Sequence, residues 1–180
     1  MRILFCDQSL LRFGFCLVEL KEDYCEVINY GLLQLNGKIH YIERLIQIES
    51  WLVNYLRKHD IEQLVVEEIQ FQRNVQTFRK LCVLQYVMEA LCYKNSILYA
   101  KPLQVHVWRT NGVRKLLHLS NGSKMTLYEH LNRRLNYPDS FDTNQADAIG
   151  MAQYWCAQNT SIPFVLDNAK QIIIKDKGIC

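Results

Sequence analysis

The pattern of apolar and polar residues along the chain predicts alternating strands and helices. Residues 3–6, 13–20 and 25–35 are largely apolar, β-branched or aromatic and predict three strands, the last two antiparallel. Apolar residues at three- and four-residue spacing predict helices over 39–57 and 74–93, and 124–135 and 143–158 also read as helices. Short strands are expected at 64–66 and 96–100. This order predicts an α/β fold, with a mixed β-sheet of about five strands flanked by helices.

The composition is that of one folded domain. Hydrophobic residues make up 49% of the 180 residues and charged residues 22%, which excludes disordered, collagen-like and coiled-coil classes. Only seven Gly and three Pro are present, and no linker divides the chain. We therefore expect one domain over residues 1–158, with a tail over 159–180 that packs on it or extends it. The tail contains an apolar run at 172–174 that the pattern does not place.

Charge and cysteine content limit the partners and the compartment. The net charge of +3 permits an anionic partner but does not establish one. Seven cysteines form no C-x-x-C pair and no zinc-like spacing, so they are expected to be reduced, small core residues. The N-terminus shows neither a signal peptide nor a membrane span. These features predict a cytoplasmic protein, from a bacterium or a virus-infected cell, that has no membrane partner.

Acidic residues follow directly after two predicted core strands. Asp7 ends the first strand, and Glu67 and Glu68 follow the apolar triplet 64–66. If these strands are parallel neighbours, two carboxylates converge at the sheet edge where α/β folds bind ligands. Magnesium would offset their repulsion, and two such ions can activate water and stabilise the leaving oxygen of a phosphodiester. Successive strand residues point to opposite faces, so only one of the two glutamates enters the site, and the pattern does not choose between them.

A third acid lies on the last long helix. Asp142 and Gln145 form a capping-box pattern, so Asp142 most simply caps that helix. Asn144 and Asp147 are three residues apart and share one helix face. A single acid at the end of an element is more often a cap or a solvated residue. Three acids, each at the end of a core element, match what a two-metal nuclease needs.

These residues resemble a known family, the RuvC-type Holliday-junction resolvases of the RNase H-like superfamily. The resemblance covers roughly residues 2–157. It rests on ILFCDQS at 3–9 with Gly14 and Phe15, on LVVEEI at 64–69 with the helix start at Asn74, and on ADAIGMA at 146–152. It implies an RNase H-like sheet and a homodimer that nicks four-way DNA junctions. It also implies that the dimer forms through the helix over 74–93, which carries apolar residues on more than one stripe.

The resemblance further implies a metal site. Asp7, Glu67, position 144 and Asp147 would hold two Mg²⁺ ions, for which Mn²⁺ can substitute. It thereby selects Glu67 over Glu68. Asn144 departs from the usual carboxylate of the family, so the second ion would bind more weakly, or Asp142 would reach in instead.

DNA-binding residues also follow from the resemblance. Lys124 matches a catalytic lysine that stabilises developing charge near the scissile phosphate, and His106 falls where another lysine often stands. Phe71 follows the catalytic Glu, where relatives use an aromatic side chain against junction bases. The alternatives are a solvated lysine at position 124 and a core aromatic at position 71. A cluster of basic residues predicts salt-sensitive DNA binding; the alternative is that these residues are ordinary helix surface. The cluster consists of Arg73, Arg79, Lys80, Lys101, Arg109, Arg114 and Lys115.

The function predicted from the sequence is a magnesium-dependent DNA endonuclease that resolves four-way junctions by paired symmetric nicks. One alternative is an RNase H-like nuclease that acts on other branched DNA or on RNA–DNA substrates. A second, motivated by Asn144, is a junction-binding protein without catalytic activity. A third is an RNase H-like structural subunit that binds no DNA.

Overall fold

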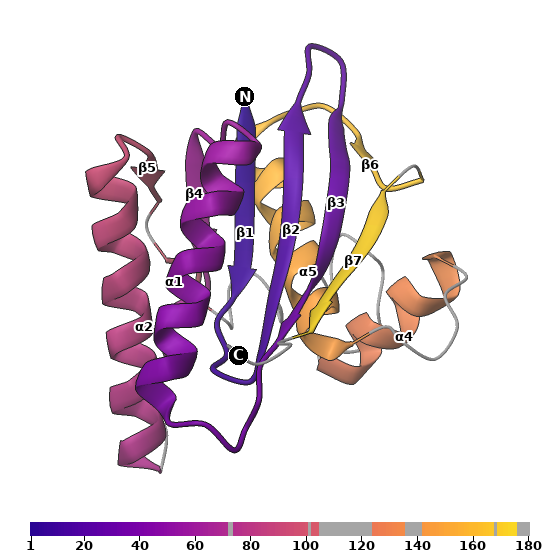
Figure 1. Cartoon of the computed structure of the whole chain (residues 1–180). Helices are drawn as coiled ribbons and strands as arrows, with labels where there is room; N and C mark the ends of the chain where they lie inside the picture. Colours follow the sequence, from indigo (N-terminus) through magenta and orange to yellow (C-terminus); the bar gives the residue numbers. More distant parts are fainter. Residues whose placement is uncertain (72–73, 101, 105–123, 136–141, 168, 176–180) are drawn as a thin grey trace.

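The structure is a computed structural model that describes residues 1–71, 74–100, 102–104, 124–135, 142–167 and 169–175. Within these residues a seven-stranded mixed sheet has the order β5-β4-β1-β2-β3-β6, and β7 also pairs with β3 (Figure 1). The strands are β1 (Arg2–Asp7), β2 (Arg12–Leu20), β3 (Cys25–Gln34), β4 (Gln63–Val66), β5 (Leu98–Tyr99), β6 (Phe164–Val165) and β7 (Lys170–Lys175). The helices are α1 (Tyr41–Lys58), α2 (Val75–Lys94), α4 (Lys124–Leu135) and α5 (Thr143–Asn159). The predicted α/β class is confirmed.

Strand pairing follows the predicted order. The first three strands form an antiparallel meander, and β1 pairs in parallel with β4, which pairs in parallel with β5. In the register of β1 and β4, Cys6 lies opposite Val66. The next residue on each strand is Asp7 or Glu67, so both acids reach the same edge of the sheet.

The strand count of about five was too low because the tail adds two strands. β6 and β7 both pair in parallel with β3. Residues 172–174 therefore belong to β7, where Gly31 of β3 lies opposite Ile172. A Cβ at Gly31 would lie 2.0 Å from the Ile172 carbonyl oxygen, so glycine allows the close approach of β7. The expected strand at 96–100 is shortened to Leu98–Tyr99.

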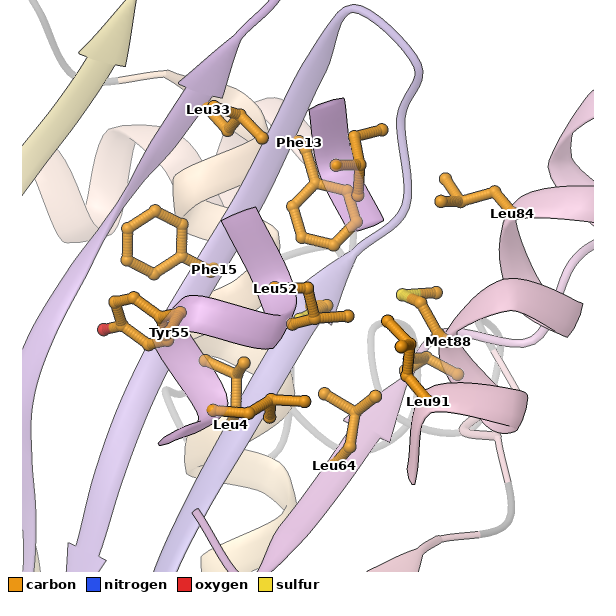
Figure 2. Close-up of a cluster of buried hydrophobic side chains, with 14 of the residues drawn as sticks. Leu4, Phe13, Phe15, Leu33, Leu52, Tyr55, Leu64, Leu84, Met88 and Leu91 are labelled. Carbon is orange, nitrogen blue, oxygen red and sulfur yellow. The ribbon is translucent and has the colours of Figure 1, made fainter. Parts of the chain in front are cut away.

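Helices cover both faces of the sheet. Strand residues alternate between the two faces, so Leu4 and Phe15 face α1 and α2, whereas Ile3 and Phe5 face α5. On the first face, Leu52 of α1 and Met88 of α2 complete a buried cluster (Figure 2). On the second face, the core of the sheet packs against α5 and against leucines of α4.

Small residues bring α5 close to the sheet. A Cβ on Gly14 of β2 would lie 2.2 Å from the backbone oxygen of Asn144, closer than atoms can approach. Ala146, Ala148 and Gly150 continue the small side chains along α5, and all three are buried. The first turn of α5 is therefore held directly over β2.

The remaining expectations concern cysteines and membranes. Of the cysteines at described positions, Cys82 is exposed and the other five are buried as free thiols. This confirms the predicted core role for those five. Among the described residues, no helix has the length and apolarity needed to cross a membrane.

Candidate active site

The parallel ends of β1 and β4 place Asp7 and Glu67 at one edge of the sheet. Asp7 is the last residue of β1 and is only 6% exposed, and Glu67 directly follows β4. The Gln8 side chain links the two strand ends, since its Nε2 donates to the Glu67 backbone oxygen at 2.8 Å. Burial raises the pKa of the adjacent Cys6 thiol, and the nearby Cys92 and Asp7 raise it further. Cys6 therefore stays neutral, and the negative charge at this edge comes from carboxylates.

A cavity of about 520 Å³ opens at this edge. It is lined by oxygen donors from three elements, Asp7, Glu67 and Asn144, and by two cations, Arg44 of α1 and Lys80 of α2. The other lining residues are Gln8, Ser9, Leu10, Leu11, Thr77 and Leu81. The structure thus brings together, around one space, residues that are far apart in the sequence.

Glu67 and Glu68 lie in different surroundings. Glu68 is exposed and lines a separate cavity beside Phe78 and Tyr86 of α2. This agrees with the expectation that Glu67 and Glu68 point to opposite sides, as successive residues of an extended chain do. Only Glu67 shares a cavity with Asp7.

The start of α5 shows the predicted capping box. The Asn144 backbone N–H donates to Asp142 Oδ1, and the Asp142 N–H donates to Gln145 Oε1, both at 2.8 Å. The Asp142 carboxylate also pairs with the Arg12 guanidinium, with a distance of 2.7 Å from Nε to Oδ2. Asp142 is not among the residues that line the cavity. Its carboxylate is occupied by the helix cap and by Arg12 rather than replacing Asn144.

Asn144 and Asp147 occupy successive turns of α5. The Asn144 amide nitrogen donates to the Arg12 backbone oxygen, and Oδ1 is the acceptor atom of this side chain, the kind of oxygen that can ligate a cation. Asp147 is fully buried and does not line the cavity. Within the described ranges, no group of three or more His, Cys, Asp and Glu residues is placed to hold a metal ion.

The donors around the cavity nevertheless fit a hard cation. Asp7 and Glu67 supply carboxylate oxygens and Asn144 supplies a carbonyl oxygen. Mg²⁺ is bound by one or two carboxylates and keeps several waters or phosphate oxygens. The site therefore has oxygen donors that suit a hard divalent cation, with less negative charge at position 144 than a carboxylate would give.

Among the predicted DNA-binding residues, Phe71, Arg79 and Lys80 lie in the described part of the chain, and Arg79 is exposed on α2. Phe71 is 76% exposed and makes an edge contact with Phe78, with ring centroids 5.3 Å apart. The alternative that Phe71 is a core residue is therefore wrong. Lys80 lines the cavity and its Nζ lies 4.9 Å from the centroid of the Tyr41 ring.

Several predicted residues lie outside the described residues. These are Arg73, Lys101, His106, Arg109, Arg114 and Lys115. Lys124 begins α4, but its side chain is also outside the described part. Arg44 was not predicted as a site residue, because its helix showed only the amphipathic pattern of a helix that packs on the sheet.

The mixed sheet, the carboxylates at the ends of its parallel strands and the helix across its face define an RNase H-like fold. Solved structures share this fold. The structure of Thermus thermophilus RuvC in complex with a Holliday junction substrate matches with a TM-score of 0.66 and 14% identity, over 88% of this chain and 96% of that chain. The yeast mitochondrial Holliday junction resolvase Ydc2 matches with a TM-score of 0.61 and 14% identity, over 85% and 76% of the two chains.

The family model described as crossover junction endodeoxyribonuclease RuvC matches residues 3–154. The chain therefore belongs to the RuvC family, as its motifs predicted. A curated relative, the crossover junction endodeoxyribonuclease RuvC of Halothermothrix orenii, is 34% identical over 77 residues, which are 43% of this chain and 47% of the relative. The chain thus matches about half the length of that relative. Nucleases of this family are metal-dependent.

Proposed function

We propose that this protein is a metal-dependent DNA endonuclease that resolves four-way junctions by paired symmetric nicks. The observation that carries the proposal is the cavity at the sheet edge, where Asp7, Glu67 and Asn144 meet. Family membership over residues 3–154 supports a nuclease, and the similar Thermus thermophilus fold was solved with a Holliday junction substrate. We place the reaction in DNA recombination and in the cytoplasm.

Magnesium is the proposed cofactor, with two ions per site and Mn²⁺ as a substitute. Asp7 and Glu67 would hold the ions together with Asn144. Asp147, buried one turn further along α5 and outside the cavity lining, is the fourth proposed ligand. When bound, the ions would activate a water molecule and stabilise the leaving oxygen of the phosphodiester. The oxygen-only donor set supports this choice of metal.

The protein's own side chains would bind and orient the DNA. Phe71 presents an exposed ring at the start of α2, where it can stack on or wedge between junction bases. Lys80 supplies positive charge to the cavity that holds the acids. Arg73 and His106 complete the proposed DNA contacts, and Lys124 would also stabilise charge that develops at the scissile phosphate.

A homodimer is the proposed assembly. Along α2, an exposed apolar stripe runs through Val75, Val83, Tyr86 and Tyr93, and the two tyrosines are 71% and 88% exposed. The buried side of the same helix packs on the sheet through Leu84 and Met88. A second copy covering the stripe would place two active sites on one junction. Sedimentation of the protein tests this directly, with twice the monomer mass expected.

The domain proposal is that residues 159–180 extend the nuclease domain. Pairing of β6 and β7 with β3 supports it.

A non-catalytic junction-binding protein is the second candidate. The neutral Asn144, whose amide nitrogen is bound to the Arg12 backbone, favours it. The deciding experiment offers a labelled four-way junction, a flap and an RNA–DNA hybrid to the protein, with Mg²⁺ or Mn²⁺ titrated from zero. The proposed nuclease nicks the junction preferentially, at paired positions and only with metal. Tight junction binding without nicking at any metal concentration would establish the second candidate instead.

A further inference from the structure

The cavity that contains the acids is also lined by positively charged side chains. Arg44 of α1 and Lys80 of α2 line it together with Asp7 and Glu67. Both basic side chains are half-buried. Lys80 Nζ lies over the Tyr41 ring, 4.9 Å from its centroid, so its ammonium group is held between the two helices.

Arg44 and Lys80 do not take part in the salt bridges found among the described residues. The Arg44 Nε is buried and has no hydrogen-bond partner within the same ranges. A buried donor without a partner costs free energy, and a half-buried guanidinium is commonly paired with an anion. The cavity therefore offers binding capacity for an anionic ligand.

The arrangement matches the chemistry of a phosphodiester. A guanidinium presents a planar fork of donors that fits two phosphate oxygens, and an ammonium adds a compact positive charge. Thr77 lies three residues before Lys80 on α2, on the same helix face, and adds a hydroxyl to the cavity lining. The three groups thus offer donors to one anion beside the acids that would hold metal.

We propose that Arg44, Lys80 and Thr77 form a binding site for a backbone phosphate of the DNA strand that is to be cut. This inference rests on the proposed function. Held on one side by this phosphate site and on the other by the acidic edge, the strand is positioned with its scissile bond over Asp7 and Glu67. Arg44 and Lys80 are then positioning residues, and their loss weakens DNA binding as well as cleavage.

The test measures binding of a fluorescein-labelled four-way junction in EDTA and in Ca²⁺, over a series of salt concentrations. Arg44→Gln is expected to weaken binding roughly tenfold and to reduce the slope of log K against log salt by about 0.9, the value for one phosphate contact. Lys80→Gln is expected to act in the same direction. Arg44→Lys keeps the positive charge but loses the planar fork of guanidinium donors. It should therefore retain the salt dependence of log K and weaken binding severalfold.

Arg57→Gln is the matched control. Arg57 is an exposed residue near the end of the same helix, about 20 Å along its axis from Arg44. Its removal should leave affinity and salt slope unchanged. Thermal unfolding of each variant verifies that it is folded. If Arg44→Gln does not fold, the binding measurements on Arg44→Lys test the phosphate site instead.

The outcomes separate this inference from the proposed function. If the wild-type protein nicks the junction but Arg44→Gln keeps its affinity and slope, the phosphate site is wrong and the nuclease assignment stands. If the wild-type protein neither binds nor nicks the junction, both are wrong. A loss of nicking in Arg44→Gln with unchanged binding would also overturn the phosphate site.

Discussion

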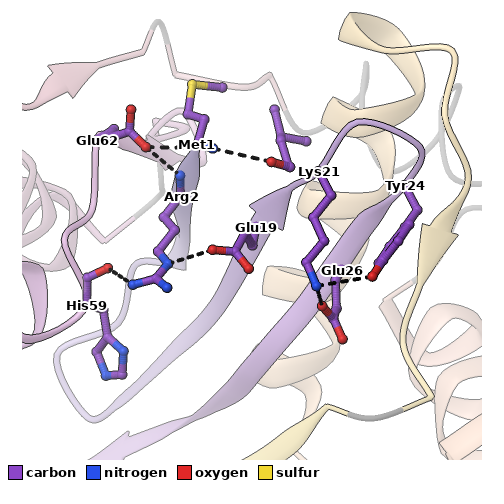
Figure 3. A network of polar contacts seen from close by, with 9 residues as sticks. Met1, Arg2, Glu19, Lys21, Tyr24, Glu26, His59 and Glu62 are labelled. Carbon is purple, nitrogen blue, oxygen red and sulfur yellow. Dashed lines mark hydrogen bonds and ion pairs between the residues drawn. The ribbon is translucent and has the colours of Figure 1, made fainter.

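The two ends of the central strands use charge in different ways. At the amino end of β1, Arg2 pairs with Glu19 at 2.9 Å and also donates to the His59 backbone oxygen at 3.0 Å (Figure 3). Nearby, the Met1 amino group lies 3.8 Å from Glu62, and Lys21 of the β2–β3 turn pairs with a glutamate of β3. Each of these cations has a local anion.

At the carboxyl end, by contrast, like charges gather around a cavity. The acids Asp7 and Glu67 and the cations Arg44 and Lys80 all line it. A cavity lined by both signs of charge suits a ligand pair that brings the opposite charges, a metal ion for the acids and a phosphate for the cations. The comparison teaches that charge at the amino end serves the fold, whereas the carboxyl end carries both a fold-stabilising pair, Arg12–Asp142, and cavity-lining charges that suit binding.

The largest expected effect comes from removing charge at the carboxyl end. Asp7→Asn should reduce junction nicking at least about a thousandfold, because a residue proposed to hold the metal loses its charge. Junction binding should persist, since the basic residues remain. The matched control at the amino end is Glu19→Gln, which should nick at the wild-type rate. Equal activity of the two variants would remove the distinction between the two ends.

A smaller effect is expected where α5 is seated on the sheet. Gly14→Ala would place a Cβ 2.2 Å from the Asn144 backbone oxygen, so the first turn of α5 must shift. We expect a loss of about 1–3 kcal/mol, which corresponds to a fall in Tm of roughly 2–12 °C, together with reduced nicking. Gly37→Ala is the control, since its Cβ would lie 3.4 Å from a Leu11 methyl group. If both variants keep the wild-type Tm and activity, the close seating of α5 does not matter.

The smallest effect is expected at the amino end. Arg2→Gln breaks a pair whose side chains are 38% and 26% exposed, so the free energy of unfolding should fall by only about 0.2–1 kcal/mol. Nicking should be unchanged. Denaturant unfolding and the junction assay measure the two quantities, and a large loss of activity would show that this end also takes part in the reaction.

The sequence predicted the features that depend on local patterns. The capping box at Asp142 requires residues only three apart, and the strand before Asp7 is a continuous apolar run. The shared edge of Asp7 and Glu67 followed from a general rule for parallel strands joined by a crossover.

Features that depend on packing between distant elements were missed or left open. Arg44 lines the cavity because α1 and α2 pack side by side on one face of the sheet, which no local pattern encodes. β6 is only two residues long, and although residues 172–174 form an apolar run, the pairing of β7 with β3 depends on contacts between distant parts of the chain. The exposure of Phe71, which makes an edge contact with Phe78 of α2, likewise depends on tertiary packing.

The most direct test of the central claim compares two adjacent glutamates. Glu67 shares the cavity with Asp7, whereas Glu68 lies in a separate one. The measurement is the nicking rate of a four-way junction in Mg²⁺ for Glu67→Gln and Glu68→Gln, with binding measured in parallel. We predict that Glu67→Gln binds but does not nick and that Glu68→Gln nicks at nearly the wild-type rate. Full activity of Glu67→Gln would contradict the proposed active site.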